Sequence, residues 1–381
     1  MNQYEVVIIG AGLAGLQLAR LLGRQGLKVL LVDRKSSVDQ SIHTTGIFSR
    51  RTLEDFDFPE DCLGVPIHDV TLYSPTRRSL MLTSPKDEFR IGRMGPLYSR
   101  FLGHCLRNGV EWKPHTRYGG HQALKRELVI RLDTQKSSRW VKTRFLVGAD
   151  GANSRVAREL GLDTNHECIV GLEDVFTNLK FNGPPCLHCF LDPKLAPGYL
   201  AWFAWDGEEA HVGVGGYASL FDPLSALETF RRSLREIVHL EGASLVERRG
   251  GRIPVGGVLR NIANENGLLV GDAAGAVSPL TAGGLDPCMR LSSHAARIIT
   301  EYLEAGNVEV LKRYSGNLFR ARFTSRLWMR RLLNHSRHRL LLEAAFVTVC
   351  LPPFRSLAWH VFFGRGSFPE VEEQLAPQPI F

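Results

Sequence analysis

The chain has 381 residues, of which 44% are hydrophobic and 23% are charged, and its formal net charge at pH 7 is +8. This composition is that of a folded globular protein, which excludes a disordered chain, and the length predicts two or more lobes. Seven cysteines, an odd number, argue against a disulfide framework. Residues 1–5 lack the features of a secretory signal, so we expect a cytoplasmic protein.

A strand, a glycine-rich turn, a helix and a second strand follow one another over residues 6–33. The continuous apolar run at 6–9 predicts a strand buried on both faces of a parallel sheet. Glycines at 10, 12 and 15 permit a tight turn, the approach of a pyrophosphate and close packing of the helix on the strand. The helix directs its N-terminal amides at the phosphates. The cofactor contacts predicted here are Gly10, Ala11, Gly12, Leu13, Ala14 and Gly15.

The second strand, over residues 28–32, delivers an acid to the same site. Asp33 stands 23 residues after Gly10, close to the spacing of an acid that accepts hydrogen bonds from a ribose diol, and Arg34 follows it. An acid at this position disfavours a 2′-phosphate, so the expected nucleotide is FAD or NAD. A glycine-rich turn without a ligand is the alternative interpretation.

Two later segments favour FAD. A Gly-Ala-Asp-Gly segment at 148–151 and a Gly-Asp-Ala-Ala-Gly segment at 271–275 each follow an apolar strand, and the second leads to a glycine pair at 283–284. Asp150 and Asp272 therefore fall where parallel strands end, which is the edge at which open α/β sheets bind ligands. Three such segments at one edge suit one long ligand.

In this order, the three motifs resemble the FAD-dependent oxidoreductases that include p-hydroxybenzoate hydroxylase and geranylgeranyl reductase, over about residues 1 to 305. The resemblance implies an α/β fold, in which a Rossmann-like FAD-binding domain of the glutathione reductase type carries an inserted antiparallel-sheet substrate domain and a C-terminal helical region. It implies that Asp33 holds the adenosine ribose, that Asp272 binds the ribityl and pyrophosphate side, and that Asp150 lies near the pyrophosphate. Further implied contacts are Thr45, Gly46 and Arg93, with Gly283, Gly284 and Leu285 against the isoalloxazine.

The pattern along the chain predicts three parts. Residues 1–66, 90–162 and 253–308 form the FAD-binding domain, residues 67–89 and 163–252 form the substrate-binding sheet, and residues 309–381 form a basic amphipathic helical region. Short strands are expected at 67–82, 89–91, 128–132, 140–147, 175–181, 199–205 and 211–217, and helices at 96–108 and 224–240.

Aromatic side chains are concentrated at residues 196–205. Tyr199 and Trp202 are expected to line the cavity for an extended apolar substrate, because large rings commonly line such sites. The segment is similar to one in geranylgeranyl reductases, although Ala204-Trp205 departs from the expected terminal proline. Packing of the rings in the core of the sheet is the alternative.

Three further side chains have a functional and a structural interpretation. His43 lies in a loop that the resemblance brings to the flavin and is the candidate proton donor, since imidazole takes both forms at cytosolic pH. A surface histidine is the alternative. Cys288 follows the glycine pair and is either a thiol near the flavin or a small buried residue. Arg93 is either the FAD contact named above or a surface charge.

Cysteine and histidine residues between 166 and 189 supply possible zinc ligands. These residues are His166, Cys168, Cys186, His188 and Cys189. Their pairs lack the regular spacing of a zinc finger or ribbon, and alternating residues of these types on strands are more often packed side chains. We therefore expect no metal.

The positive charge of the chain is concentrated near its end. Between Val310 and Leu342 there is no Asp or Glu, and the nine Lys and Arg residues there exceed the net charge of the whole chain. Interleaved Leu, Phe and Trp side chains predict an amphipathic helix, and residues 312–363 are expected to contact an anionic membrane surface from the cytoplasmic side. The apolar runs are too short to cross a bilayer. A helical lobe packed on the FAD domain is the alternative, and nucleic acid is not expected.

These features predict an FAD-dependent oxidoreductase of the geranylgeranyl reductase-like group, which reduces a double bond in an apolar isoprenoid, quinone or lipid-like small molecule. NAD(P)H or a protein electron donor is the expected reductant, because no second nucleotide-binding unit is evident. Three alternatives remain open: an aromatic monooxygenase that uses NAD(P)H and O2, a halogenase, and a membrane-associated flavoprotein that transfers electrons or binds a partner without catalysis. The sequence leaves the oligomeric state open.

Overall fold

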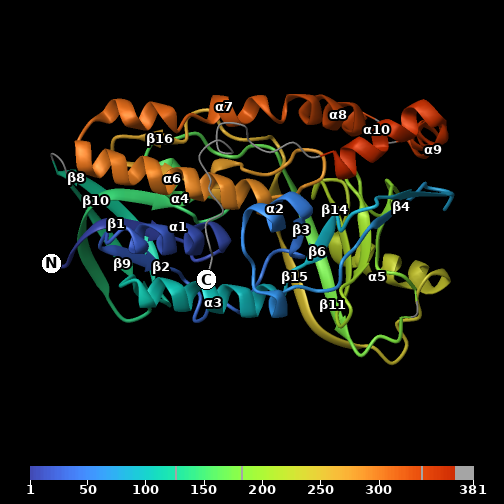
Figure 1. The fold of residues 1–381 in the computed structure, drawn as a ribbon, viewed down its shortest axis with the longest axis horizontal. Coiled ribbons are helices and arrows are strands. Elements are labelled where there is room, and N and C mark those ends of the chain that lie inside the picture. Colours follow the sequence, from blue (N-terminus) through green and yellow to red (C-terminus); the bar gives the residue numbers. More distant parts are fainter. Residues whose placement is uncertain (125–126, 182, 336–337, 365–381) are drawn as a thin grey trace.

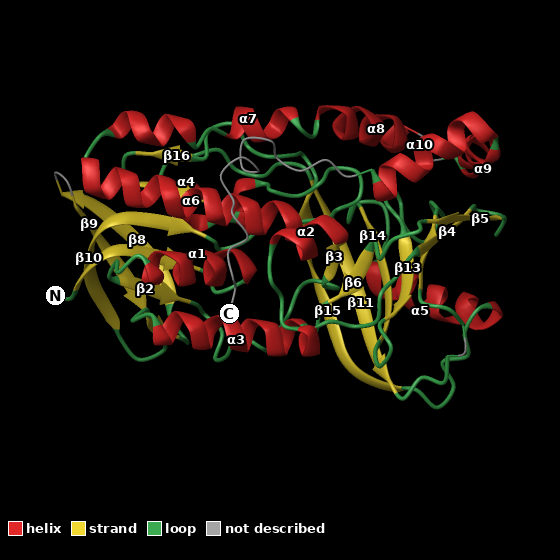
Figure 2. Ribbon diagram, in the orientation of Figure 1, coloured by secondary structure: helices red, strands yellow, loops and turns green. Residues whose placement is uncertain are grey.

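A computed structural model describes residues 1–124, 127–181, 183–335 and 338–364. Two β-sheets lie at opposite ends of an elongated molecule, and the helices after residue 285 run along one long side (Figure 1). Figure 2 shows the same division by secondary structure, with helices packed on each sheet and along the shared side. The mixed α/β class predicted from the sequence is confirmed.

The centre of the first sheet consists of four adjacent parallel strands, and a fifth parallel strand flanks them. β1 (Gln3–Ile9) pairs with β2 (Val29–Val32) on one side and with β10 (Ser138–Gly148) on the other, and β10 pairs with β17 (Gly267–Leu269). The carboxyl-terminal halves of these strands are buried, as expected for apolar runs inside a parallel sheet. The sheet is completed by β7 (Glu111–Lys113), β8 (Arg117–Leu124), β9 (Glu127–Asp133) and β16 (Ala263–Asn264).

Three long helices pack against one another beside this sheet. α1 (Leu13–Arg24) contacts both α3 (Met94–Arg107) and α6 (Leu285–Ala305). Gly10, at a φ of +107°, makes the turn between β1 and α1, a conformation that L side chains rarely adopt. A Cβ on Gly15 would lie 1.9 Å from the carbonyl oxygen of Gly10, so the helix approaches the turn this closely only because residue 15 is glycine. The predicted strand, turn and helix are therefore present.

The second sheet has seven strands and one departure from the expected antiparallel pattern. Its order is β15 (Ser244–Pro254), β11 (Cys168–Thr177), β14 (Ala210–Gly216), β13 (Ala201–Trp205), β12 (Cys186–Phe190), β4 (Asp69–Tyr73) and β5 (Ser79–Thr83). All neighbours are antiparallel except β12 and β4, which run parallel. This pair joins segments more than a hundred residues apart, so no hairpin turn dictates its direction.

Shorter elements complete the second lobe. α5 (Pro223–Ser233) covers one face of the sheet by packing Leu227 and Phe230 against it, and it is shorter than the helix predicted at 224–240 because a 3₁₀ turn follows it at Leu234–Glu236. The small sheet of β3 (Ile47–Ser49) and β6 (Phe89–Ile91), together with α2 (Arg50–Asp55), lies between the two lobes.

The basic C-terminal region consists of four helices where the structure describes it. They are α7 (Gly316–Ala321), α8 (Thr324–His335), α9 (Arg339–Cys350) and α10 (Pro352–Phe363). Pro352 occupies the first turn of α10, where its missing N–H costs little. Of the predicted region 309–381, residues 336–337 and 365–381 lie outside the described residues. The division into three parts stays a prediction.

Three arginines of these helices, Arg320, Arg326 and Arg330, are directed into the protein rather than into solvent. Arg330 is only 2% exposed and donates to the carbonyl oxygen of Pro279. Arg320 donates to the carbonyl oxygens of Gly256 and Val258, and Arg326 donates to a serine hydroxyl in the loop after β17. These three residues therefore do not belong to a solvated arginine face of the helices. Large apolar side chains are exposed on the outer surface of these helices, with Leu340 84% and Trp328 61% exposed.

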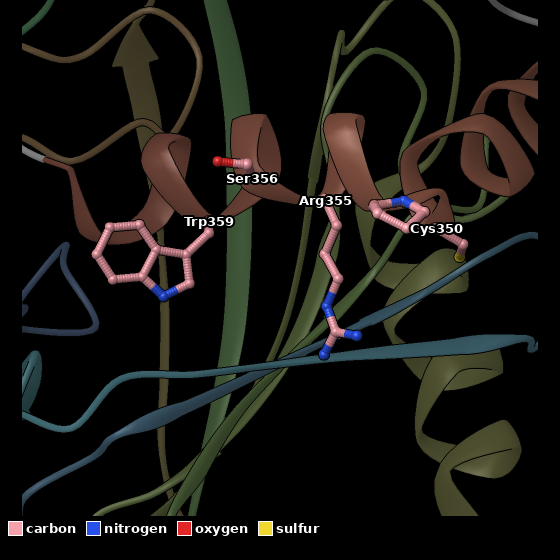
Figure 3. A pocket seen from close by; sticks show the side chains of 5 residues that line it. Cys350, Arg355, Ser356 and Trp359 are labelled. Carbon is pink, nitrogen blue, oxygen red and sulfur yellow. The ribbon is translucent and has the colours of Figure 1, made fainter.

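The last two helices are bent sharply against each other. Among the described helices, none is by itself long and apolar enough to be a candidate span, and α9 and α10 meet that criterion only as a pair bent by 99°. A hollow of about 340 Å³ lies where the two helices meet. Figure 3 shows side chains that line it, and among them Arg355 points toward the strands beneath. Arg355 donates to the carbonyl oxygen of Met81 and Trp359 to that of Thr83, so α10 is fastened onto β5.

Candidate functional site

A cavity of about 1280 Å³ lies between the two sheets. It begins at the turn after β1, passes the loops that follow β10 and β17, and continues along the inner face of the second sheet to helices α9 and α10. Most of the predicted site residues line it: Gly10, Gly12, Leu13, Ala14, Asp33, Arg34, His43, Thr45, Gly46, Asp150, Tyr199, Trp202, Asp272, Gly283, Gly284 and Leu285. Residues far apart in the sequence thus meet in one space.

The strand ends explain why these residues meet. β2, β1, β10 and β17 are adjacent and parallel, so the residues that follow them gather at one edge of the first sheet. Asp33 follows β2, Gly10 follows β1, Asp150 follows β10 and Asp272 follows β17.

The turn after β1 forms an open cradle at the start of α1. A Cβ on Gly12 would meet no atom of the described residues within 4 Å, so the space in front of this residue is free for a ligand. Gly12 is the N-cap of α1 and makes no side-chain cap, which leaves first-turn amides directed at that space. Backbone amides and the positive end of the helix dipole suit a pyrophosphate. The residues present therefore fit the phosphates of a dinucleotide.

Asp33 holds the turn as well as lining the cavity. One carboxylate oxygen accepts from the backbone N–H of Ala11 at 2.7 Å, and the other accepts from that of Lys35 at 2.9 Å. Ala11 and Gly15 do not themselves line the cavity: Ala11 serves through this hydrogen bond, and Gly15 through its contact with Gly10.

Asp150 caps the short helix α4 (Arg155–Glu159). Its carboxylate accepts from the Ser154 hydroxyl at 2.6 Å and from the backbone N–H groups of Arg155 and Val156 at 2.7 and 3.1 Å. Burial raises the pKa of this carboxyl. The aspartate that the sequence assigned to the nucleotide thus fixes a helix at the rim of the cavity.

Asp272, which is half-buried, and Cys288, which is buried, both lie on the wall of the cavity. Burial raises the pKa of the Asp272 carboxyl to about 6. The pKa of the Cys288 thiol is also raised, mainly by burial and to a smaller extent by the charge of the nearby Asp272. The thiol is therefore protonated at neutral pH and a poor nucleophile. This favours the interpretation of Cys288 as a small buried residue.

The effect of burial on Asp272 predicts how stability depends on pH in the protein without cofactor. The ordinary pKa is 3.8 and the folded value is about 6, so the folded state binds more protons between these values. The free energy of unfolding contributed by Asp272 therefore falls as pH rises through this window. Asp272→Asn removes this titration. The free energy of unfolding of the variant minus that of wild type, measured by urea unfolding, should therefore rise between about pH 4 and about pH 7 and stay constant above pH 7. A difference that does not change with pH would contradict the raised pKa.

The loop at 283–285 brings the start of α6 to the cavity. Gly284 is the N-cap of this 21-residue helix, which begins at Leu285, and both residues line the cavity. Pro287 lies in the first turn, where its missing N–H costs little. The positive end of the helix dipole therefore faces the cavity and stabilises negative charge there.

Glu173 organises the wall between the cradle and the second sheet, and sequence reasoning missed it. Its carboxylate accepts from the Thr45 hydroxyl at 2.5 Å and from the Trp202 indole N–H at 2.9 Å. His211 lies 3.3 Å from the same carboxylate. Burial alone would raise the pKa of Glu173, but these partners outweigh it and leave the pKa below its ordinary value. A lone Glu on an alternating strand carries no signal of this role.

His43 sits at the edge of the cavity on the Glu173 side. Its Nδ1 lies 2.7 Å from the carbonyl oxygen of Gly250, so this nitrogen carries the proton. Burial is the main reason that the pKa of His43 is lowered. Its expected role as proton donor stays a prediction.

Arg93 lies away from the cavity. It is not among the lining residues, and its guanidinium pairs with Glu208 at 2.8 Å. The geometry gives no support to the FAD contact expected of it.

Beyond Trp202, the cavity continues as an apolar arm. Its walls come from the inner face of the second sheet and from α9 and α10, with lining residues that include Leu72, Leu187, Cys189, Leu191, Phe346, Val349, Ala358, Val361 and Phe362. Leu332, Phe354 and Leu357 also line it, yet they are 69%, 45% and 52% exposed. The arm therefore opens onto the outer apolar surface of the C-terminal helices.

Comparison with known proteins places this geometry in context. The chain matches the FAD binding domain family over residues 3–58 and 100–327. It is similar to digeranylgeranylglycerophospholipid reductase 3 of Methanosphaera stadtmanae, with 28% identity over 320 residues that cover 80% of this chain and 79% of the relative.

Two solved structures share the fold. A geranylgeranyl bacteriochlorophyll reductase-like protein from Thermoplasma acidophilum superimposes with a TM-score of 0.80 at 17% identity, covering 99% of this chain and 98% of that one. The p-nitrophenol 4-monooxygenase of Pseudomonas putida gives a TM-score of 0.69 at 17% identity, covering 98% of this chain and 97% of that one. At these identities the likeness is one of fold alone.

Proposed function

The chain belongs to the FAD binding domain family and is an FAD-dependent oxidoreductase, and from this premise we propose that it reduces carbon–carbon double bonds in the isoprenoid chains of a lipid. The matched relative is named as a reductase of such a lipid, and the match covers about four-fifths of both chains. The identity of the reductant belongs to the proposal as well: NAD(P)H or a reduced protein supplies the electrons.

The apolar arm is the observation that carries this proposal. An isoprenoid chain is long, flexible and without hydrogen-bonding groups, so it needs an extended apolar tunnel rather than a compact polar pocket. The arm runs from the Trp202 wall to the surface of α8 and α10 and is lined by aliphatic and aromatic side chains. An aromatic monooxygenase substrate is small and polar by comparison and leaves this arm without a purpose.

Different residues along the cavity have different roles. When bound and reduced, the FAD cofactor would supply the hydride that the double bond accepts. The start of α1 holds the pyrophosphate, while the start of α6 stabilises negative charge at the other end of the cofactor. Tyr199, whose hydroxyl donates to the carbonyl oxygen of Thr281, and Trp202, held by Glu173, form the wall that positions the lipid and excludes water.

His43 is the proposed source of the proton. Burial lowers its pKa, so the imidazolium is a stronger acid but a smaller share of the population at neutral pH. The rate of reduction should therefore fall as pH rises through the pKa of this residue.

The proposal is tested by the spectrum of the flavin without oxygen. The FAD-loaded protein is reduced anaerobically with dithionite and then mixed with a lipid that carries geranylgeranyl chains. We expect the oxidised flavin spectrum to return, because the double bond removes the hydride. A fully saturated lipid is the matched control and should leave the flavin reduced. If reoxidation requires O2 and a phenol accelerates it, the monooxygenase is the correct assignment.

We also propose that the C-terminal helices rest on an anionic membrane surface, from which the substrate enters. Two observations support this proposal: the exposed apolar side chains of α8–α10, and the mouth of the arm among them. An outer surface of this kind suits the interfacial region of a bilayer, with nearby cations such as Arg331 contacting head groups.

Replacing two exposed leucines at the start of α9 tests the membrane proposal. Leu340 and Leu341 are 84% and 55% exposed, and a fully buried leucine contributes about 1.5–3 kcal/mol. The double variant Leu340→Glu, Leu341→Glu should therefore weaken co-sedimentation with anionic phospholipid vesicles at least about tenfold. Leu224→Glu, an equal change at a leucine of α5 that is 43% exposed, should bind as wild type does. If all three proteins bind the vesicles equally, the C-terminal helices are not the membrane-binding surface.

A further inference from the structure

A second group of potential ligands lies at the hairpin between β13 and β14, away from the glycine turn. Asp206, Glu209 and His211 each offer one ligand atom, and these atoms lie within 4.8 Å of one another. The Nε2 atom of His211 is 4.0 Å from a carboxylate oxygen of Glu209. The spacing of these residues in the sequence matches no familiar zinc motif and therefore does not predict a metal site.

Two buried atoms of this group lack partners. Asp206 and His211 are each 1% exposed, and Oδ2 of Asp206 and Nε2 of His211 have no hydrogen-bond partner within the residues that the structure describes. A buried polar atom without a partner is costly and uncommon in folded proteins. Two such atoms in one small group indicate that something else satisfies them.

The remaining contacts of these side chains point their free atoms at one another. Oδ1 of Asp206 accepts from the backbone N–H groups of Glu208 and Glu209, which fixes the turn and leaves Oδ2 to the group. Nδ1 of His211 lies 3.3 Å from Glu173, so this nitrogen donates and the lone pair of neutral His211 resides on Nε2. A histidine whose second nitrogen donates to a carboxylate is the usual arrangement of a metal ligand.

We propose that this hairpin binds a divalent transition metal ion of the Zn²⁺ type through Asp206, Glu209 and His211. Imidazole combined with carboxylate ligands suits Zn²⁺ better than Mg²⁺ or Ca²⁺, which prefer oxygen alone. Bonds of about 2.0–2.1 Å place tetrahedral ligands about 3.3 Å apart, so binding draws His211 and Glu209 together by less than about 1 Å. Water completes the coordination.

The surrounding charges favour a cation. The carboxylates of Asp206, Glu209, Glu208 and Glu173 gather here, and the guanidinium groups that face them are those of Arg93 and Arg249. Arg93 is engaged by Glu208 at 2.8 Å, while Arg249 lies 3.8 Å from Glu173. Arg249 is also engaged by Glu247 at 2.8 Å, so carboxylates outnumber guanidinium groups here, and this excess of negative charge favours a divalent cation.

The ion would act on the cavity through Glu173. This residue joins His211 to the Thr45 hydroxyl and to the Trp202 indole, so an occupied site braces the wall beside the cradle. These groups act as positioning residues, and the inference does not depend on the substrate or on the reaction proposed above.

Zn²⁺ titration of the full-length, FAD-loaded protein tests the proposal. The protein is prepared without a histidine tag, stripped with EDTA, and titrated with Zn²⁺ alone in a calorimeter against a competing chelator. Wild type should bind one Zn²⁺ that Asp206→Asn and His211→Gln fail to bind. Glu173→Gln removes only an outer partner of His211 and should weaken the Zn²⁺ affinity about 10- to 100-fold. Loss of a direct ligand should weaken the Zn²⁺ affinity by more than this.

The variants are chosen so that folding and binding are separated. Asp206→Asn keeps an oxygen to accept the two backbone N–H groups and removes only the second carboxylate oxygen. Glu304→Gln, the same change at an exposed carboxylate of α6, is the matched control and should bind Zn²⁺ as wild type does. Retained FAD shows that a variant is folded. If wild type binds no Zn²⁺, or if all variants bind it equally, the site does not exist and His211 is held only by Glu173.

Discussion

Gly12→Val should abolish FAD binding and leave the FAD-free protein folded. A Cβ at this position meets no described atom within 4 Å, and the backbone of Gly12, at φ −76° and ψ −176°, is one that any residue adopts. The change at the N-cap costs about 1 kcal/mol of stability at most. The added methyl groups fill the space assigned to the pyrophosphate, so the affinity for FAD should fall at least about 100-fold, or about 3 kcal/mol.

Gly15→Ala is the matched variant, and it should lower the stability of the FAD-free protein, which Gly12→Val leaves folded. Its Cβ would lie 1.9 Å from the Gly10 carbonyl oxygen and 3.3 Å from the Cβ of Ala149, so the helix must shift. Overpacking of this kind costs about 1–3 kcal/mol, which lowers the stability of the protein even without FAD. Thermal unfolding of both FAD-free variants and fluorescence titration with FAD separate the two effects. A Gly12→Val protein that binds FAD normally would show that the cradle is not the phosphate site.

Ala358→Phe should block the apolar arm without disturbing the flavin. Ala358 is a partly buried residue of α10 that lines the arm beside Phe346 and Val349. A phenyl ring there occupies the path of an extended chain, so turnover of a lipid with geranylgeranyl chains should fall at least about tenfold. A short isoprenoid that reaches only the Trp202 end should be reduced at the wild-type rate. Steady-state rates with both substrates provide the measurement.

The control for this variant lies on the same helix. Ser356 is exposed in the hollow outside the arm (Figure 3), so Ser356→Phe adds equal bulk without entering the tunnel. Both variants should bind FAD as wild type does. Equal rates for long and short substrates in Ala358→Phe would mean that the lipid does not pass this residue.

The nucleotide side of the site follows from local sequence. A parallel strand that ends in glycine or aspartate delivers that residue to a known edge of the sheet, so Gly10, Asp33, Asp150 and Asp272 were predicted to meet before any coordinates. Each signal lies within a few residues of a strand. The fold class was predictable for the same reason.

The substrate side depends on contacts between distant segments. Glu173 is one polar residue on a strand, and only the pairing of β11 with β14 brings it to His211 and, across the cavity wall, to Thr45 and Trp202. The arm exists because α9 and α10 fold back onto a sheet whose strands β4 and β12 precede them by more than a hundred residues. Periodicity in the sequence gives the faces of these helices but not their direction, so the inward arginines were not predicted.

We propose that one cavity holds both FAD and an isoprenoid chain, so that a hydride passes from the reduced flavin to the chain. The most direct test is the mass of a geranylgeranyl lipid extracted after one anaerobic turnover with the reduced, FAD-loaded protein. We expect a gain of two hydrogens for each reduced flavin that is oxidised, and no gain of oxygen. A lipid of unchanged mass beside a fully loaded and reduced flavin, or one that gains oxygen once air is admitted, would contradict it.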